Sequence, residues 1–169
     1  MKKSLERNFT TILEGSTNMK EKIFNTTDSY APLAIRIMLG LVVFPHGAQK
    51  LLGWFGGYGF SGTMGFFTET IGLPWIVGFI VIILESFGAI ALIAGFATRL
   101  VAANYILLAL GIIFSSHIQN GFFMNWFGNQ AGEGYEFFLL WIGMAVGLLI
   151  TGSGAYSIDK DLILKNIDN

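Results

Sequence analysis

The chain contains no cysteine, and this absence excludes several kinds of chemistry. Without thiols the protein cannot form disulfides, use a thiolate nucleophile, ligate an iron–sulfur cluster or carry out thiol redox reactions. Histidine is scarce as well, with two residues, and no nucleotide-binding fingerprint is present. Any redox chemistry therefore needs electrons from a partner chain or from a cofactor that the sequence does not reveal.

Charged residues are also few. They make up 12% of the 169 residues, against 53% hydrophobic residues and a mean hydropathy of +0.62. This composition is too apolar for a soluble domain of this length, so we expect an integral membrane protein. The net charge of -1 offers no basic face to neutralise phosphates, and nucleic acid is not expected as a partner.

Long apolar stretches supply the membrane-spanning segments. Each of them approaches the roughly 20 helical residues that cross about 30 Å of hydrocarbon. The stretches are Pro32 to Leu52, Trp75 to Phe96, Leu100 to Ile118 and Glu136 to Gly152. They do not alternate with the period of two that a barrel requires. The expected fold class is therefore all-α, an integral membrane four-helix bundle with amphipathic outer loops.

The expected domain organisation is simple. Residues 1–30 form a polar N-terminal cytoplasmic segment, residues 31–158 form the four-helix domain, and residues 159–169 form a cytoplasmic tail. No apolar run of the length that a cleavable signal peptide requires precedes Pro32, so the first membrane helix is expected to act as the targeting signal.

Lysine and arginine near the ends of membrane helices indicate orientation. The N-terminal segment and the tail are rich in them, and Arg99 lies in the connection between the second and third stretches. On the other side there is only Lys50. Both termini are therefore expected in the cytoplasm, with the protein in a bacterial cytoplasmic membrane.

Ionisable residues inside the apolar stretches locate a candidate site. A charge at the bilayer centre costs about 2.5 to 3.5 kcal/mol on insertion scales, so such groups usually pair around an internal cavity. Seven residues belong to this set: Arg36, His46, Lys50, Glu85, Arg99, His117 and Glu136. At about 100° per residue, Arg36, His46 and Lys50 share one face of the first helix.

The depth of each group in the bilayer sorts the set further. His46, Lys50 and His117 belong near the outer boundary, together with Asn120 and Glu136. Glu85 is the only charge in its helix and sits near the midplane. An unpaired carboxylate there is costly, so we expect Glu85 to be buried within reach of a cation from the first helix, Arg36 or Lys50.

The ordered set of these residues resembles the DoxX family of small four-helix membrane proteins. The resemblance runs from about Ala31 to Asp159. It is carried by Arg36, His46-Gly47, Lys50, Gly53-Trp54-Phe55-Gly56-Gly57, Glu85, Gly95, Thr98-Arg99, His117, Asn120-Gly121-Phe122 and Glu136.

The resemblance implies association with oxidoreductase systems, because relatives include a thiosulfate:quinone oxidoreductase subunit and a member of a membrane complex linked to oxidative-stress enzymes. Other relatives resemble assembly or chaperone proteins, so the fold does not fix the activity. The candidate residues fall into two groups. His46, His117 and Glu85 are the candidates for catalysis, and Arg36, Lys50, Asn120 and Glu136 are the candidates for ligand binding.

Two classes of function follow. In the first, the chain is a membrane subunit of an oxidoreductase that binds a quinone or a similar small redox-linked ligand, with the histidines and Glu85 handling protons. Haem or zinc at His46 and His117 is disfavoured. In the second, the chain is a non-enzymatic assembly or scaffold protein, or a transporter of a small solute. The expected partners are the bilayer and a redox subunit, and self-association into a homo-oligomer is compatible with the sequence.

The orientation can be tested directly because the chain has no cysteine of its own. Single cysteines at Lys3 and Gly128 are expected to respond oppositely to an impermeant thiol reagent in intact cells, with only position 128 labelled. Labelling of position 3 alone would overturn the cytoplasmic placement of the termini.

Overall fold

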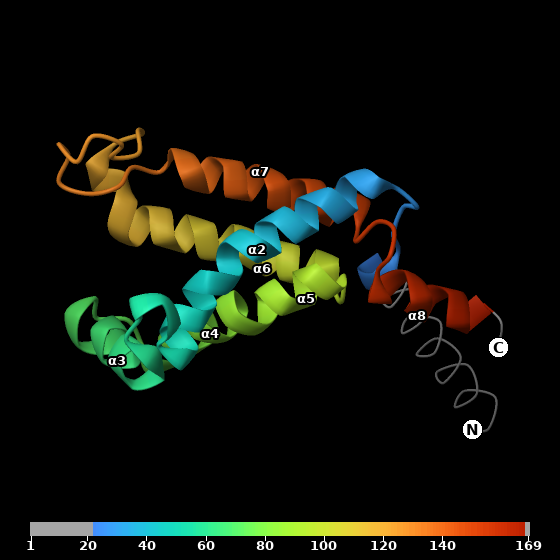
Figure 1. Cartoon of the computed structure of the whole chain (residues 1–169), viewed down its shortest axis with the longest axis horizontal. Helices are drawn as coiled ribbons and strands as arrows, with labels where there is room; N and C mark the ends of the chain where they lie inside the picture. The colour runs from blue at the N-terminus through green and yellow to red at the C-terminus, as the bar shows by residue number, and fades with distance from the viewer. Residues whose placement is uncertain (1–21, 168–169) are drawn as a thin grey trace, which may run out of the picture.

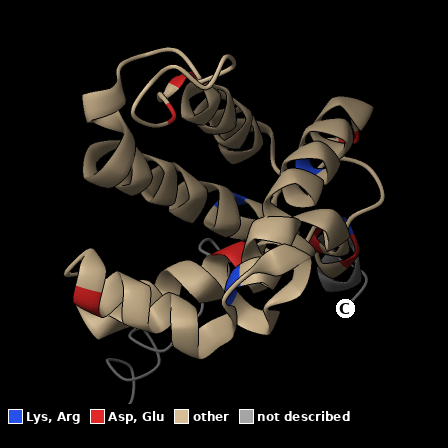
Figure 2. Ribbon diagram, turned by 60° about the vertical axis from the view of Figure 1, so that its left-hand side comes forward, with Lys and Arg blue, Asp and Glu red and all other residues tan. Residues whose placement is uncertain are grey.

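The structure is a computed structural model and describes residues 22–167. Residues 1–21, which make up most of the expected N-terminal segment, and residues 168–169 lie outside this range. The described part of the chain is helical and contains no strand, which confirms the all-α fold class. Figure 2 shows how few charged positions interrupt the long helices.

Four apolar helices form the body of the protein. The first helix is α2 (Tyr30–Leu52), and the fourth is α7 (Glu136–Thr151). The second helix is continuous through α4 (Trp75–Ile83), η3 (Leu84–Gly88) and α5 (Ala89–Ala94). The third helix is continuous through α6 (Thr98–Ile112), η4 (Ile113–His117) and η5 (Ile118–Asn120). Every expected boundary is confirmed to within two residues. With 23, 20 and 23 residues, the first three are long enough to cross a bilayer. The 16 residues of α7 extend about 24 Å, somewhat less than the hydrocarbon thickness.

The connections differ in character. The first contains η1 (Trp54–Gly56), α3 (Gly59–Gly65) and η2 (Phe66–Thr70), whereas residues 121–135 are irregular. After α7 the chain continues into α8 (Ile158–Ile167). These two connections lie at one end of the bundle, here called the loop end, and the first and last described residues, 22 and 167, lie at the other, here called the terminal end (Figure 1).

The four helices pack tightly at the terminal end and separate towards the loop end (Figure 1). The third helix pairs with α7, while α2 packs along η3 and α5 and also contacts α7. Side chains from all four helices make up the buried core, including Leu39, Leu92, Tyr105, Ala109, Trp141 and Leu148. This packing leaves α4 apart from the loop-end half of the third helix.

Arg36 connects three segments at the terminal end. It is 1% exposed, and each of its five N–H groups donates to a backbone carbonyl. The acceptors are Leu92 and Ile93 at the end of α5 and Ser153, Ala155 and Tyr156 after α7. Carbonyls at helix ends lack their usual intrahelical partners, and the guanidinium supplies donors to them; of the five, the Leu92 carbonyl also accepts from the Gly95 backbone N–H at 3.0 Å.

The backbone around Arg36 leaves little space. Gly95 has φ +68°, and a Cβ there would lie 3.0 Å from the Arg36 Cζ and 2.5 Å from the Ser157 Cβ. Glycine is therefore required on both conformational and steric grounds. The turn allows α5 to end directly over the guanidinium.

Asp159, at the start of α8, holds the beginning of the third helix. Its carboxylate accepts from the backbone N–H of Ala97 at 2.6 Å and of Thr98 at 3.0 Å. Burial raises the pKa of the Asp159 carboxyl, and the N–H groups of Thr98 and Ala97 and the charge of Arg36 oppose the rise. The contact satisfies two N–H groups that a helix start leaves without partners and fixes α8 against the bundle.

Replacing Arg36 tests this account. Arg36→Met removes all five of these hydrogen bonds, and within the described residues only the Leu92 carbonyl keeps a second donor, the Gly95 N–H, so we expect a loss of at least about 3 kcal/mol of stability. Arg36→Lys keeps the charge but not the planar fork, and should cost less. Thermal unfolding in detergent measures both, with Lys160→Met in the exposed pair with Asp28 as the control. A melting temperature of Arg36→Met equal to that of the control would contradict the role given to Arg36.

Candidate functional site

A cavity of about 760 Å³ lies where α4 and the third helix separate. Its walls come from α2, α4, η3, the third helix and α7, and both connections contribute residues at the loop end. Most of its lining is apolar. The polar or ionisable residues in the lining are His46, Lys50, Glu85, Asn104, Ser115, Ser116, His117 and Glu133.

An ion pair forms part of the cavity wall. The Lys50 ammonium lies 2.5 Å from Oε2 of Glu85, and the side chains are 24% and 4% exposed. Lys50 is in the last turn of α2 and Glu85 is in η3, so the pair joins the first two membrane helices. The expectation that Glu85 is buried beside a cation from the first helix is confirmed, with Lys50 as that cation.

Close backbone packing positions the pair. A Cβ on Gly47 would lie 2.4 Å from the carbonyl oxygen of Glu85, so α2 and η3 touch at this level. The Ser86 hydroxyl donates to the Gly47 carbonyl at 3.1 Å and fixes the same contact. One side of the Glu85 backbone is therefore firmly packed, and its carboxylate borders the cavity.

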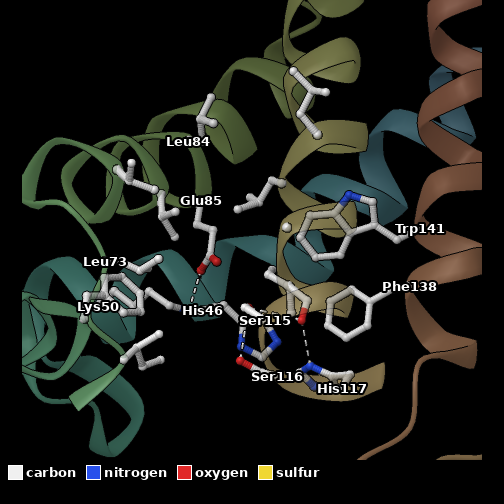
Figure 3. Close-up of a pocket in the computed structure, with 18 of the residues that line it drawn as sticks. His46, Lys50, Leu73, Leu84, Glu85, Ser115, Ser116, His117, Phe138 and Trp141 are labelled. Atoms are coloured by element: carbon white, nitrogen blue, oxygen red, sulfur yellow. Dashed lines mark hydrogen bonds and ion pairs between the residues drawn. The ribbon is translucent and has the colours of Figure 1, made fainter. Parts of the chain in front are cut away.

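Both histidines line this cavity (Figure 3). His46 lies one helical turn before Lys50 on α2 and is exposed, as a side chain facing an open space would be. His117 lies at the end of η4, on the third helix. Its ring packs edge-on against Phe138 with centroids 4.8 Å apart, and its Nδ1 is 3.3 Å from the Ile112 carbonyl oxygen. When Nδ1 carries the proton and donates to that carbonyl, Nε2 is free to accept.

Three π-helical segments contribute to the cavity wall. Phe66 and Phe67 line the cavity from η2, Glu85 lines it from η3, and His117 lines it from η4. A π turn inserts one extra residue into a helix and shifts the direction of the side chains that follow, and such turns are frequent at functional sites. Local backbone geometry, as well as helix packing, therefore sets the positions of Glu85 and His117.

The other candidate residues lie elsewhere. Arg36 is bound to carbonyls at the terminal end and does not line the cavity. Glu136 accepts from the Met124 backbone at 2.9 Å and from the Trp126 indole at 3.3 Å. Asn120 donates to the Glu133 carbonyl at 3.0 Å. The last two hold the second connection in shape rather than face the cavity.

Sequence reasoning did not single out Asn104, Ser115 and Ser116, which all line the cavity. A signal for two of them was present. Asn104, Gly111 and Ser115 are separated by seven and four residues, which places them on one face of the third helix. A stripe of small and polar residues on an apolar helix is a reasonable sign of a cavity wall.

The geometry allows hydrogen bonding and proton transfer but offers no metal site. Within residues 22–162 no group of three or more His, Asp or Glu side chains is arranged to hold a metal ion. The Lys50 ammonium has three N–H donors and can contact both Glu85 and a ligand. An imidazole next to such a pair can donate or accept a proton.

Comparison with known proteins identifies the family. The DoxX family model matches residues 31–118. The chain belongs to the DoxX family. The match includes four of the ionisable residues that line the cavity, His46, Lys50, Glu85 and His117, and it ends before Asn120 and before the fifth, Glu133. DoxX is a family of small membrane proteins, so the apolar helices and the family agree on an integral membrane protein.

A relative gives the family its functional context. The chain is 28% identical over 135 residues to a protein of Bacillus subtilis (strain 168) named putative oxidoreductase CatD. The alignment covers 80% of this chain and 89% of CatD. No solved structure gives a significant match.

A double-mutant cycle tests the ion pair. Lys50→Met leaves a buried carboxylate without its cation, and we expect it to lower stability by about 3 kcal/mol. Lys50→Met combined with Glu85→Leu removes both charges and is expected to recover most of that loss. The exposed pair of Lys160 and Asp28 is the matched control and should show a coupling below about 1 kcal/mol. Additive losses at Lys50 and Glu85 would contradict a direct pair.

Proposed function

We propose that this chain is the membrane subunit of an oxidoreductase system and that it binds a quinone in the cavity. One observation carries the proposal: His46, Lys50, Glu85 and His117, all from the membrane-spanning helices, line one largely apolar cavity of about 760 Å³. Small-molecule sites typically have volumes of about 300 to 1,000 Å³, apolar walls and a few convergent polar groups. A quinone has the matching chemistry, with an apolar ring and two carbonyl oxygens.

Each ionisable group has a role in this proposal. His46 donates a hydrogen bond to one quinone oxygen, and His117, whose Nδ1 faces the Ile112 carbonyl, donates to the other when a proton is added at Nε2. The Lys50 ammonium stabilises the negative charge that develops on an oxygen as electrons arrive. Glu85 holds Lys50 in place and exchanges protons with the histidines. Reduction of a quinone to a hydroquinone takes up two electrons and two protons, and a redox partner protein supplies the electrons.

The comparisons agree with this role at a coarser level. DoxX membership and a relative named as a putative oxidoreductase support an association with membrane oxidoreductases. The absence of cysteine and of a nucleotide fingerprint makes a separate electron donor necessary. In this proposal the electrons enter through a partner subunit, and this chain supplies the site at which the quinone receives them.

Alanine substitutions of the histidines test the proposal. His46→Ala and His117→Ala are each expected to weaken quinone binding about tenfold or more, since a hydrogen bond contributes about 1 to 1.5 kcal/mol. Both should abolish quinone-linked activity in cells while leaving the melting temperature close to that of the wild type. Quenching of tryptophan fluorescence by an added naphthoquinone provides the binding measurement, because Trp141 lines the cavity.

The control is Gln130→Ala, an exposed polar residue at the loop end that does not line the cavity. It should change neither binding nor activity. If both histidine variants keep full activity, or lose it only together with the fold, the polar groups are structural and the scaffold function replaces this proposal.

A further inference from the structure

Part of the cavity wall is exposed at the height of the membrane. Val77 and Ile80 on α4 are 40% and 46% exposed, and Leu107 on α6 is 67% exposed, although all three line the cavity. They belong to helices long enough to span a bilayer, so lipid tails rather than water surround this part of the protein. The cavity is therefore open sideways, between α4 and α6.

The loop end of the cavity is bordered differently. Phe66, Phe67, Ile71 and Leu73 from the first connection and Met124 from the second line the cavity there. These side chains make the border at the loop end mostly apolar, with Glu133 as the ionisable residue that the two connections add to the lining. Access from the bilayer is thus more open to an apolar molecule than access from water.

Gly111 lies beside the lateral opening. It lines the cavity, is exposed, and follows Leu107 by one helical turn. A Cβ built on Gly111 meets no atom within 4 Å, so a side chain there would fit without a clash and would extend into open space. A large residue at this position would narrow the opening without disturbing the packing of the bundle.

We infer that the ligand of this cavity carries a long apolar chain and enters between α4 and α6, through an opening that Gly111 keeps wide. The inference rests on the proposed function and specifies the ligand class as an isoprenoid-tailed quinone. The ring lies at the ionisable end, and the chain leaves through the opening into the bilayer. Because lipid tails are as apolar as leucine side chains, a chain that stays in the bilayer loses no favourable surroundings when the ring binds.

The experiment compares two ligands in lipid nanodiscs. One is 2,3-dimethyl-1,4-naphthoquinone, which has no tail, and the other is a menaquinone with four isoprenoid units. The wild type is expected to bind both. Gly111→Phe should weaken equilibrium binding of the tailed quinone about tenfold and leave that of the tailless ring nearly unaffected, because in the bound state only the tail occupies the narrowed opening.

The chain offers matched controls on α7. Gly143 is likewise exposed and has no atom within 4 Å of a built Cβ, but it does not line the cavity, so Gly143→Phe should leave both affinities unchanged. A second pair guards against misfolding of one variant. Leu107→Trp narrows the same opening, whereas Leu140→Trp changes an equally exposed leucine, 69% against 67%, on α7.

Each outcome bears on the inference. If the wild type binds the tailless ring and excludes the tailed quinone, the cavity is closed to the bilayer and the inference is wrong, while the proposed function stands. If neither quinone binds, both fail. If Gly111→Phe binds both quinones normally but no longer co-purifies with a partner, the opening is a subunit interface and the inference is overturned.

Discussion

Hydrocarbon cannot solvate a charge, and this constraint governs how the bundle is assembled. Every charged group inside the membrane-spanning helices needs a partner from another part of the chain. Arg36 finds five carbonyls from α5 and from the segment after α7, and Glu85 finds the ammonium of Lys50 from α2. Both contacts join α2 to the second helix, one at each end, and the close backbone approach at Gly47 lies beside Lys50. The cations of both contacts, Arg36 and Lys50, therefore come from α2, whereas Arg99 on the third helix donates to the carbonyls of Asn25, Leu149 and Ile150.

Arg36 and Lys50 differ in how many N–H donors they have left to bind a ligand. All five donors of Arg36 are used, and the group is 1% exposed, so nothing remains for a ligand. Lys50 makes one contact with Glu85 and retains further N–H donors beside a cavity. Both residues looked equivalent as intramembrane cations in the sequence. Packing separates them into a structural group at the terminal end and a group available for binding beside the cavity.

The sequence predicted the four helices to within two residues because hydropathy and length alone determine which segments cross a bilayer. It also predicted that Glu85 pairs with a cation of the first helix, because an isolated carboxylate there is costly. The sequence did not reveal that Arg36 binds carbonyls, since every helix end offers carbonyl acceptors and no residue type marks the ones that Arg36 reaches. Nor did it reveal the π turns at Glu85 and His117, because these depend on a local change in helical register. Asn120 and Glu136 have polar side chains at the depth expected for the ligand site. Only the path of the second connection shows that these side chains stabilise that connection.

A ligand-binding role gains support from the asymmetry around Glu85. If the polar groups only specified helix packing, side chains would be expected to close around the pair, as the segments at the terminal end close around Arg36. Instead, the backbone of Glu85 is in tight contact with Gly47 on one side, while the carboxylate borders about 760 Å³ of open space on the other. Protein interiors are close-packed, so a side chain that only specifies helix packing is normally surrounded by other side chains. An open space with apolar walls beside a buried ion pair suits a protein that holds an apolar ring against two histidines better than it suits a scaffold.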